Sequence, residues 1–569
     1  MGRSNFYADH HIFCCTTILG KMNEGKGTLG IYAIQDRIDT NYPQYVHDHN
    51  LALMNNGEVK KFLQLERISR IKRDNKLYVH LPELIKHSGL AEADVDVVFV
   101  DNVVGRAMIS SSGQIRFEAP LNPKLTKDVE KGKLWWIYRE PDSYILNHEL
   151  AHIFSCLPFY GSFEENSLLV HFDGGASLSN FSAWIYKMGK IIPVEHHWEL
   201  KPFTSLFNAN ALTFGIIGAT IEDQNSVPGK LMGYAALGTY NEEIDFWLRQ
   251  NNWFENIWGK RSAFFEKAKA DFGIDLKSFD QRSTFLQDIA ATIQELFMRE
   301  VLLKLDDLQS ITGCKTLYYT GGCALNIHTN SAIVESRIFE NVYIPPCPDD
   351  SGLSIGAAAF LEWKKGHTIQ INSPYLNNWG IESNNFEYTQ EDISQLAQLL
   401  SEGKIVGVCN GNGEAGPRAL GNRSILALPT KALANKVSVE KKQREWYRPV
   451  APIMLEHNAK YFTGQSSIHP LTRYMLLDLK IPENKQIEIS GVIHANGTVR
   501  IQTIFEKKEN PFLYELLSLL DEQYNIKALI NTSFNNKGNP IVHTAQDAIK
   551  SAQEMDLDAI VINGKITII

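Results

Sequence analysis

The pattern that most constrains the fold is an apolar strand that runs into a glycine turn and then into a helix. It occurs at residues 317–326, LYYTGGCALN, and again at residues 344–360, IPPCPDDSGLSIGAAAF. Such a turn sets backbone N–H groups against a nucleotide phosphate. Because both turns are expected to flank one sheet, they predict an α/β domain with a nucleotide at the sheet edge. The candidate nucleotide-binding residues are Gly321, Gly322, Asn326 and Gly352.

A pair of histidines predicts a metal site. His148 and His152 lie four residues apart in a helical segment, so both imidazoles fall on one face, one turn apart. Two neutral imidazoles held in this way begin a divalent-metal site. The apolar run 167–172 ends in Asp173 and two glycines, which offers a third ligand beside bound phosphate. A carboxylate before the second glycine turn is a plausible fourth ligand.

Two other interpretations of the histidine pair stay open. Residues 148–152 also spell H-E-x-x-H, the zinc-peptidase pattern in which Glu149 would be the general base. Alternatively, the segment is a helix with two partly exposed histidines and no metal. These five residues alone do not separate the three interpretations.

A second group of titratable residues surrounds a predicted hairpin. Two short strands, 50–54 and 59–64, flank Asn55-Asn56-Gly57, and Asn-Gly between apolar runs is a strong hairpin signal. His47-Asp48-His49 comes just before the hairpin. Polar residues crowded at strand ends suggest a site, where His47 could take a proton from an attacking hydroxyl. A surface-loop histidine is the alternative.

The chain divides into regions by composition. Its 569 residues predict more than one domain. We expect an N-terminal extension at 1–28, a first domain at 29–365, a polar, Asn-rich linker at 366–390 and a second domain at 391–569.

In the second domain, cations and amides occur beside glycines, prolines and turns. Embedded in this way rather than alternating with acids, they suggest a pocket for a multiply anionic ligand. The residues are Arg418, Arg423, Lys442, Arg444, Arg448, Arg500, Asn531 and Ser533.

Bulk properties exclude several classes of protein. The net charge of -9 signals no general affinity for nucleic acid. Seven cysteines without a C-x-x-C pair favour a reducing compartment over a disulfide framework, so we expect a cytoplasmic protein. No run approaches the roughly 18 apolar residues of a membrane span, and no membrane partner is expected.

Taken together, the motifs resemble the NodU/CmcH-type O-carbamoyltransferases, which modify antibiotics, nodulation factors and other small natural products. The matching segments occur in family order: HDHNLALMNNGE, LERISRIK, HELAH, DGG, PGKLMG, GGCALN, DDSGLSIGAA, GEAGPRALGNRSI, REWYRPVAP, HANGTVRIQT and NTSFNNKGNPIV. The resemblance implies an ASKHA (actin/Hsp70-like, Kae-type) first domain within an α/β class, and a YrdC-like α+β second domain. It implies that the second domain makes carbamoyl-adenylate from carbamoyl phosphate and ATP. The first domain would transfer the carbamoyl group to a hydroxyl of a small-molecule acceptor.

The same resemblance implies roles for single residues. His148, His152, Asp173 and Asp350 match the ligands of a divalent metal, typically iron, beside the Mg²⁺ that accompanies ATP; Asp349 competes with Asp350 for the last position. His47 matches a candidate base near the transferred carbamoyl group. Lys442, Arg448, Arg500 and Asn531 match the family's residues that contact carbamoyl phosphate and the adenylate. Arg418 and Arg423 lie in the family's central glycine-arginine segment.

This sequence also departs from the family pattern. A loop with Pro43 separates the first strand from His47, and Asn496 replaces a usual acidic residue. Three rival interpretations remain: a threonylcarbamoyl-type tRNA-modifying enzyme, the zinc peptidase, and a nucleotide-binding regulator with an inactive site. The acceptor and the oligomeric state stay open, and a homodimer is among the states considered.

Overall fold

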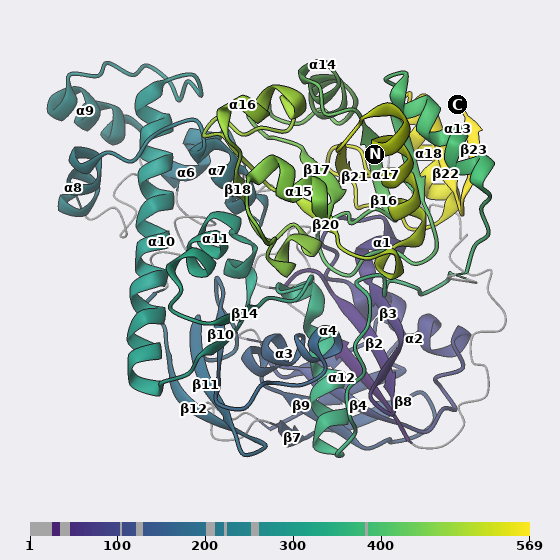
Figure 1. The fold of residues 1–569 in the computed structure, drawn as a ribbon. Helices are drawn as coiled ribbons and strands as arrows, with labels where there is room; N and C mark the ends of the chain where they lie inside the picture. Colours follow the sequence, from purple (N-terminus) through teal and green to yellow (C-terminus); the bar gives the residue numbers. More distant parts are fainter. Residues whose placement is uncertain are drawn as a thin grey trace, which may run out of the picture.

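The computed structural model describes residues 26–34, 46–102, 105–120, 129–200, 211–220, 225–251, 261–381 and 385–569. Most of the predicted N-terminal extension and the loop with Pro43 lie outside these residues. Three large sheets and the helices packed on them confirm the predicted α/β class (Figure 1). None of the helices in the described ranges is long and apolar enough to cross a membrane.

The first sheet carries the predicted hairpin. Its strand order is β3-β2-β1-β4-β9-β7, with parallel pairing of β1 to β4 and of β4 to β9. Asn56 and Gly57 both have positive φ, 49° and 75°, as the tight turn between β2 and β3 requires. The strands are β1 (Gly27–Tyr32), β2 (Asn50–Asn55), β3 (Glu58–Gln64), β4 (Val95–Val100), β7 (Val129–Lys131) and β9 (Ser143–Leu146).

The second sheet has the order β12-β11-β10-β13-β14 and carries Asp173 directly after β10. Its strands are β10 (Ser167–Phe172), β11 (Phe181–Lys187), β12 (Lys190–His197), β13 (Thr316–Thr320) and β14 (Asn341–Tyr343). Helices α3 (His148–Phe154) and α12 (Leu353–Lys364) lie between the first two sheets (Figure 1). They approach closely because Gly356 has no side chain: a Cβ there would meet the carbonyl oxygen of Ala151.

The third sheet forms the C-terminal part, residues 391–569, with the order β20-β17-β21-β16-β15-β22-β23. Helices α13 (Gln390–Ser401) and α17 (Pro511–Tyr524) pack on each other, and α18 (Ala545–Glu554) packs on β15 and β22. The strands are β15 (Val406–Cys409), β16 (Arg423–Ala427), β17 (Ala451–Leu455), β20 (Gln502–Ile504), β21 (Leu529–Ser533), β22 (Ala559–Ile562) and β23 (Lys565–Ile568).

The described residues also form shorter strands and further helices. The strands are β5 (Ala107–Ile109), β6 (Ile115–Glu118), β8 (Lys133–Trp136), β18 (Leu479–Lys480) and β19 (Thr498–Val499). The helices are α1 (Leu65–Ser69), α2 (Leu77–His87), α4 (Leu157–Tyr160), α6 (Ala211–Ile217), α7 (Val227–Ala235), α8 (Glu242–Gln250), α9 (Arg261–Phe272), α10 (Thr284–Thr312), α11 (Ile327–Ser336), α14 (Lys431–Asn435), α15 (Glu456–Thr463) and α16 (Glu483–Gln486).

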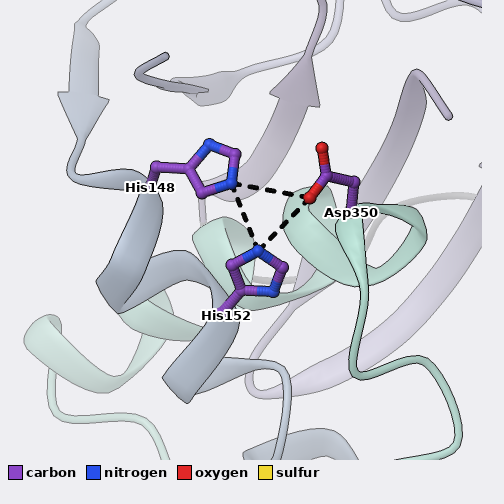
Figure 2. A group of neighbouring side chains, drawn as sticks. All are labelled: His148, His152 and Asp350. Carbon is purple, nitrogen blue, oxygen red and sulfur yellow. Dashed lines mark hydrogen bonds and ion pairs between the residues drawn. The ribbon is translucent and has the colours of Figure 1, made fainter. Parts of the chain in front are cut away.

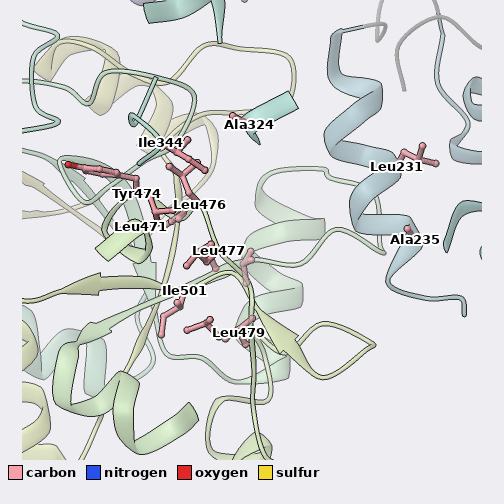
Figure 3. Close-up of a cluster of buried hydrophobic side chains, with 14 of the residues drawn as sticks. Leu231, Ala235, Ala324, Ile344, Leu471, Tyr474, Leu476, Leu477, Leu479 and Ile501 are labelled. Atoms are coloured by element: carbon pink, nitrogen blue, oxygen red, sulfur yellow. The ribbon is translucent and has the colours of Figure 1, made fainter. Parts of the chain in front are cut away.

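The N-terminal part, residues 26–365, and the C-terminal part share a hydrophobic core. Ala324 and Ile344 belong to the same buried cluster as Leu471, Leu476 and Ile501 (Figure 3). Polar contacts reinforce this junction, because Asn330 donates to the carbonyl oxygen of Leu476 at 3.0 Å. A shared core of this kind fixes the orientation of the two parts and of any site between them.

The segment predicted as a polar linker is packed rather than free. Within residues 366–390, Asn377 forms bridges to Phe62 on one side and to Gly413 on the other. Its side chain donates to Gln64 at 2.6 Å and to the carbonyl oxygen of Glu414 at 3.3 Å. The segment therefore joins the N-terminal and C-terminal parts through buried hydrogen bonds, which its Asn-rich composition did not reveal.

Candidate functional site

Three side chains from two helical segments meet in one cluster (Figure 2). His148 and His152 come from α3, whose first turn is capped by the side chain of Asn147. Asp350 comes from the turn that precedes α12. Its Oδ1 lies 3.5 Å from Nε2 of His148 and 3.3 Å from Nε2 of His152, and the two Nε2 atoms are 3.2 Å apart. All three side chains are buried.

The hydrogen bonds of the two imidazoles make this cluster suitable for a cation. Nδ1 of His148 lies 3.1 Å from the carbonyl oxygen of Asp101, and Nδ1 of His152 lies 2.9 Å from that of Pro348. A carbonyl oxygen only accepts, so each Nδ1 carries the proton and each Nε2 of a neutral ring presents its lone pair to the cluster. Two lone pairs facing each other and a carboxylate need positive charge between them, so the donors fit a divalent metal.

Asp173 extends the cluster toward the glycine turn. Its Oδ2 lies 3.8 Å from Nε2 of His152 and accepts a hydrogen bond from the backbone N–H of Gly322. Asp349 instead accepts a hydrogen bond from the hydroxyl of Ser351. Asp349 is not among the described residues whose donor atoms lie close enough together to share an ion. Of the two candidate carboxylates, Asp350 therefore faces the histidines.

Glu149, between the two histidines in the sequence, is bonded to the loop that follows Asp173. Its Oε1 accepts hydrogen bonds from the backbone N–H groups of Leu178 and Ser179 at 2.9 and 3.0 Å. The hydroxyl of Ser179 donates to the same oxygen at 3.2 Å. Glu149 thus holds the loop that follows Asp173, and it does not belong to the groups of described residues that could share an ion.

His47 lies on the side of Asp350 opposite the histidine pair. Its Nδ1 is 2.9 Å from Oδ2 of Asp48 and 4.0 Å from Oδ2 of Asp350. Burial lowers the pKa of His47, but these two carboxylates outweigh it and raise that pKa above its ordinary value. A metal cation held by Asp350 would oppose this rise, because it would neutralise the carboxylate. Tyr32 also donates to Oδ2 of Asp350, at 2.9 Å.

A cavity of about 760 Å³ connects this cluster with the C-terminal part. Most of the predicted site residues line this cavity: His47, Asp173, Gly322, Asn326, Asp350, Arg418, Lys442, Arg448, Arg500, Asn531 and Ser533. His148 and His152 lie directly behind Asp350 and Asp173.

The cations on the C-terminal wall repel one another. Burial and the neighbouring guanidinium groups lower the pKa of Arg444 and Arg500, and the pKa of Arg418 falls for the same reasons despite Asp349. Within the described part of the chain, no carboxylate lies within 4 Å of these three guanidinium groups, whereas Arg448 reaches Glu445 at 3.3 Å. Such a cluster is stabilised by a bound polyanion.

Polar groups beside the cations are also left open to a ligand. The Nε atoms of Arg418 and Arg500 and the Oδ1 atom of Asn531 are buried and have no hydrogen-bond partner among the described residues. Lys442 is engaged differently: its Nζ donates to the carbonyl oxygen and the side chain of Asn535 at 2.7 and 2.9 Å. Lys442 therefore anchors the loop that follows Ser533 as well as adding charge.

Besides His148 and His152, three predicted site residues do not line this cavity: Arg423, Gly321 and Gly352. The guanidinium of Arg423 is buried and donates to the carbonyl oxygens of Asn410, Gly411, Asn422 and His543, so this arginine holds loops together and the prediction that it binds substrate is corrected. Gly321, with φ of 93°, packs against the backbone of Phe172, and Gly352 packs against Cys347. These glycines shape the turns without reaching the cavity.

The prediction of the site was also incomplete. Lys72 and Arg73 line the cavity from the N-terminal part, and Tyr32 contacts Asp350. The signal for Lys72 was its place in the LERISRIK segment that follows the hairpin. His171 lies beside the His148–His152–Asp350 cluster, where its ring groups with His152 and Asp173, and the signal was its position two residues before Asp173.

Both halves of the chain match models of one protein family. A family model described as carbamoyltransferase N-terminus matches residues 41–359, and one described as carbamoyltransferase C-terminus matches residues 397–568. The chain therefore belongs to the carbamoyltransferase family, as the motifs predicted.

Individual relatives cover most of the chain. The nodulation protein NolNO of Sinorhizobium fredii is 26% identical over 555 residues, which is 91% of this chain and 78% of that protein. Nodulation protein U of Azorhizobium caulinodans is 26% identical over 535 residues, 86% of this chain and 92% of its own length. Among solved structures, full-length HypF in its phosphate- and nucleotide-bound form covers 60% of this chain and 56% of its own, with a TM-score of 0.34 and 11% identity.

Proposed function

We propose that this protein is an ATP-dependent O-carbamoyltransferase. It would form carbamoyl-adenylate from carbamoyl phosphate and ATP and transfer the carbamoyl group to a hydroxyl of a small molecule. The observation that carries the proposal is the single cavity in which the cation cluster of the C-terminal part faces His47, Asp173 and Asp350. Membership of the carbamoyltransferase family supports it, and the nodulation relatives favour a hydroxylated small-molecule acceptor.

The first half-reaction suits the cation cluster. Carbamoyl phosphate is hydrolysed to carbamate and phosphate, a carbamate oxygen attacks the α-phosphorus of ATP, and pyrophosphate leaves. Arg418, Arg444, Arg448 and Arg500 would bind these anions and balance the charge that develops at phosphorus. Carbamate is unstable and a poor nucleophile, so an enclosed cavity, which keeps it from escaping, favours its capture.

The second half-reaction suits the N-terminal wall. The acceptor hydroxyl attacks the carbamoyl carbon, AMP leaves, and the hydroxyl proton passes to Nε2 of His47. Asp48 accepts a hydrogen bond from Nδ1 of that ring at 2.9 Å. In a neutral imidazole the lone pair is then on Nε2, which is the atom that would receive the proton. A divalent cation held by His148, His152, Asp173 and Asp350 would supply positive charge that polarises or orients the adenylate.

The test is to incubate the full-length protein with ATP, carbamoyl phosphate, Mg²⁺ and Fe²⁺ and to measure carbamoyl-AMP and pyrophosphate. We expect both products, and we expect Arg448→Ala to lose them. The matched control is Arg473→Ala, because Arg473 pairs with Glu509 outside the cavity. The proposal is wrong if neither product forms and Arg448→Ala leaves ATP turnover unchanged. Turnover of a threonine-derived adenylate stimulated by tRNA would instead support the tRNA-modifying alternative.

A further inference from the structure

One buried imidazole near the metal cluster has no role in the proposed function. His171 lies near the end of β10 and is fully buried, with an exposed fraction of 0%. Neither of its ring nitrogens has a hydrogen-bond partner among the described residues. Buried polar groups normally have hydrogen-bond partners. An imidazole in which neither nitrogen has one therefore suggests that a binding partner is missing.

The position of His171 identifies that partner. Its ring stacks on the ring of His152, with centroids 5.0 Å apart and an interplanar angle of 27°. The rings of His148 and His152 are spaced almost equally, with centroids 4.9 Å apart. One ligand atom from each of His152, His171 and Asp173 lies within 4.8 Å of the others. Two potential ligand sets thus share His152.

Strand geometry explains why His171 faces the cluster. Side chains two residues apart on a strand lie on the same face, so His171 and Asp173 both point toward α3. The strand neighbours of His171 are Ser182 on β11 and Thr320 on β13. The hydroxyls of these two residues bond elsewhere, to Ser179 and to the carbonyl oxygen of Val170. Neither hydroxyl therefore forms a hydrogen bond with the His171 ring that could take the place of a bound metal.

We propose that His171 is a further ligand of the metal centre, beside His148, His152, Asp173 and Asp350. The protein would then offer three imidazoles and two carboxylates to one ion. Imidazole-rich sites favour Fe²⁺, Co²⁺, Ni²⁺ or Zn²⁺ over Mg²⁺, which prefers oxygen ligands. The centre would therefore be built for a transition-metal ion and kept distinct from the Mg²⁺ that accompanies ATP.

The first test measures Co²⁺ binding to the full-length protein under anaerobic conditions. His171→Leu removes both ring nitrogens, and we expect it to weaken Co²⁺ affinity by at least about tenfold in a chelator competition. It should also change the visible absorption spectrum of bound Co²⁺. The matched control is Tyr319→Phe, because the Tyr319 hydroxyl on neighbouring β13 is likewise buried and has no described partner. The control should change neither the affinity nor the spectrum.

A second variant gives a direct spectroscopic result even if His171→Leu folds poorly. In His171→Cys a thiolate replaces the imidazole, and a Co²⁺-bound thiolate produces a charge-transfer absorption in the near ultraviolet. We expect that absorption in the Co²⁺-loaded variant and not in the wild type. If the folded, loaded Cys variant lacks it, or if His171→Leu keeps the wild-type affinity and spectrum, His171 is a buried imidazole satisfied by water and the proposal is wrong.

Discussion

The carboxylate of Glu149 accepts hydrogen bonds from both the backbone N–H and the hydroxyl of Ser179, at 3.0 and 3.2 Å. These two residues are joined across the loop that begins at Asp173, a predicted metal ligand. Glu149 therefore holds the loop next to the candidate metal ligands and is not grouped with those ligands itself. The H-E-x-x-H pattern contains a structural glutamate between two ligand candidates.

This relationship predicts different outcomes for two substitutions of Glu149. Glu149→Gln keeps an oxygen acceptor, so metal affinity should stay within about threefold of the wild type. Glu149→Ala removes the acceptor shared by the backbone N–H groups of Leu178 and Ser179 and by the Ser179 hydroxyl, and it should cost about 3 kcal/mol of stability. Thermal unfolding and metal titration check both variants. Peptidase activity that disappears in Glu149→Gln would contradict this assignment.

His152 should behave in the opposite way. Its Nε2 is close to His148, Asp173 and Asp350, so His152→Ala removes the donor common to both ligand sets. We expect metal affinity to fall by about 100-fold or more, together with carbamoyl transfer. Metal analysis after dialysis and the transfer assay measure the two effects. His457→Ala is the control, because His457 is an exposed histidine paired with Asp521 in the C-terminal part; an equal loss in that variant would refute the assignment.

Arg418 and Arg423 lie five residues apart in one segment, and the structure predicts opposite consequences of losing them. Arg418 lies among like charges, so Arg418→Met should leave the free protein as stable as before, or more stable, while weakening ATP or carbamoyl phosphate binding by about 10- to 100-fold. Arg423 donates to four backbone carbonyls, so Arg423→Met should cost about 3–5 kcal/mol of stability. Calorimetric binding and denaturant unfolding separate the two effects, and a stable Arg423→Met protein that loses ligand binding would reverse the roles.

Local patterns predicted the parts of this structure that depend on neighbouring residues. The Asn-Gly turn determines the β2–β3 hairpin, and helical spacing brings His148 and His152 together. Residues from distant parts of the chain also lie together where the motifs and the family resemblance paired them, as for Asp350 with His148 and His152.

Other features depend on tertiary contacts, which a local stretch of sequence does not reveal. Arg418 and Arg423 have the same side chain and similar neighbours, yet only folding shows that one faces a cavity and the other faces four carbonyl oxygens. His171 looked like one more residue of an apolar strand, because the partner that makes it unusual lies on α3. The Asn-rich segment around Asn377 was predicted only as a linker, because its partners Phe62 and Gly413 lie before and after it in the chain.

The junction between the N-terminal and C-terminal parts should respond to pH through His328 and Asp478. His328 on α11 pairs with Asp478, and Ser331 on the same helix donates to the Asp478 carbonyl oxygen at 2.8 Å. Burial lowers the pKa of His328, but its bond to Asp478 outweighs burial and raises that pKa above its ordinary value. Burial raises the pKa of Asp478, yet His328 brings it down to about 2, so this carboxylate stays ionised above about pH 4.

The sign of the effect follows from these shifts. A histidine whose pKa is raised by folding adds stability that is complete below its unfolded pKa, about 6.5, and is lost as the pH rises through its folded pKa. His328→Gln should therefore lower Tm most at about pH 5–6, by an amount equivalent to about 1 kcal/mol, and progressively less as the pH rises above about 6.5. A Tm difference for His328→Gln that grew with pH would mean that the pair does not stabilise the junction through the protonated imidazole.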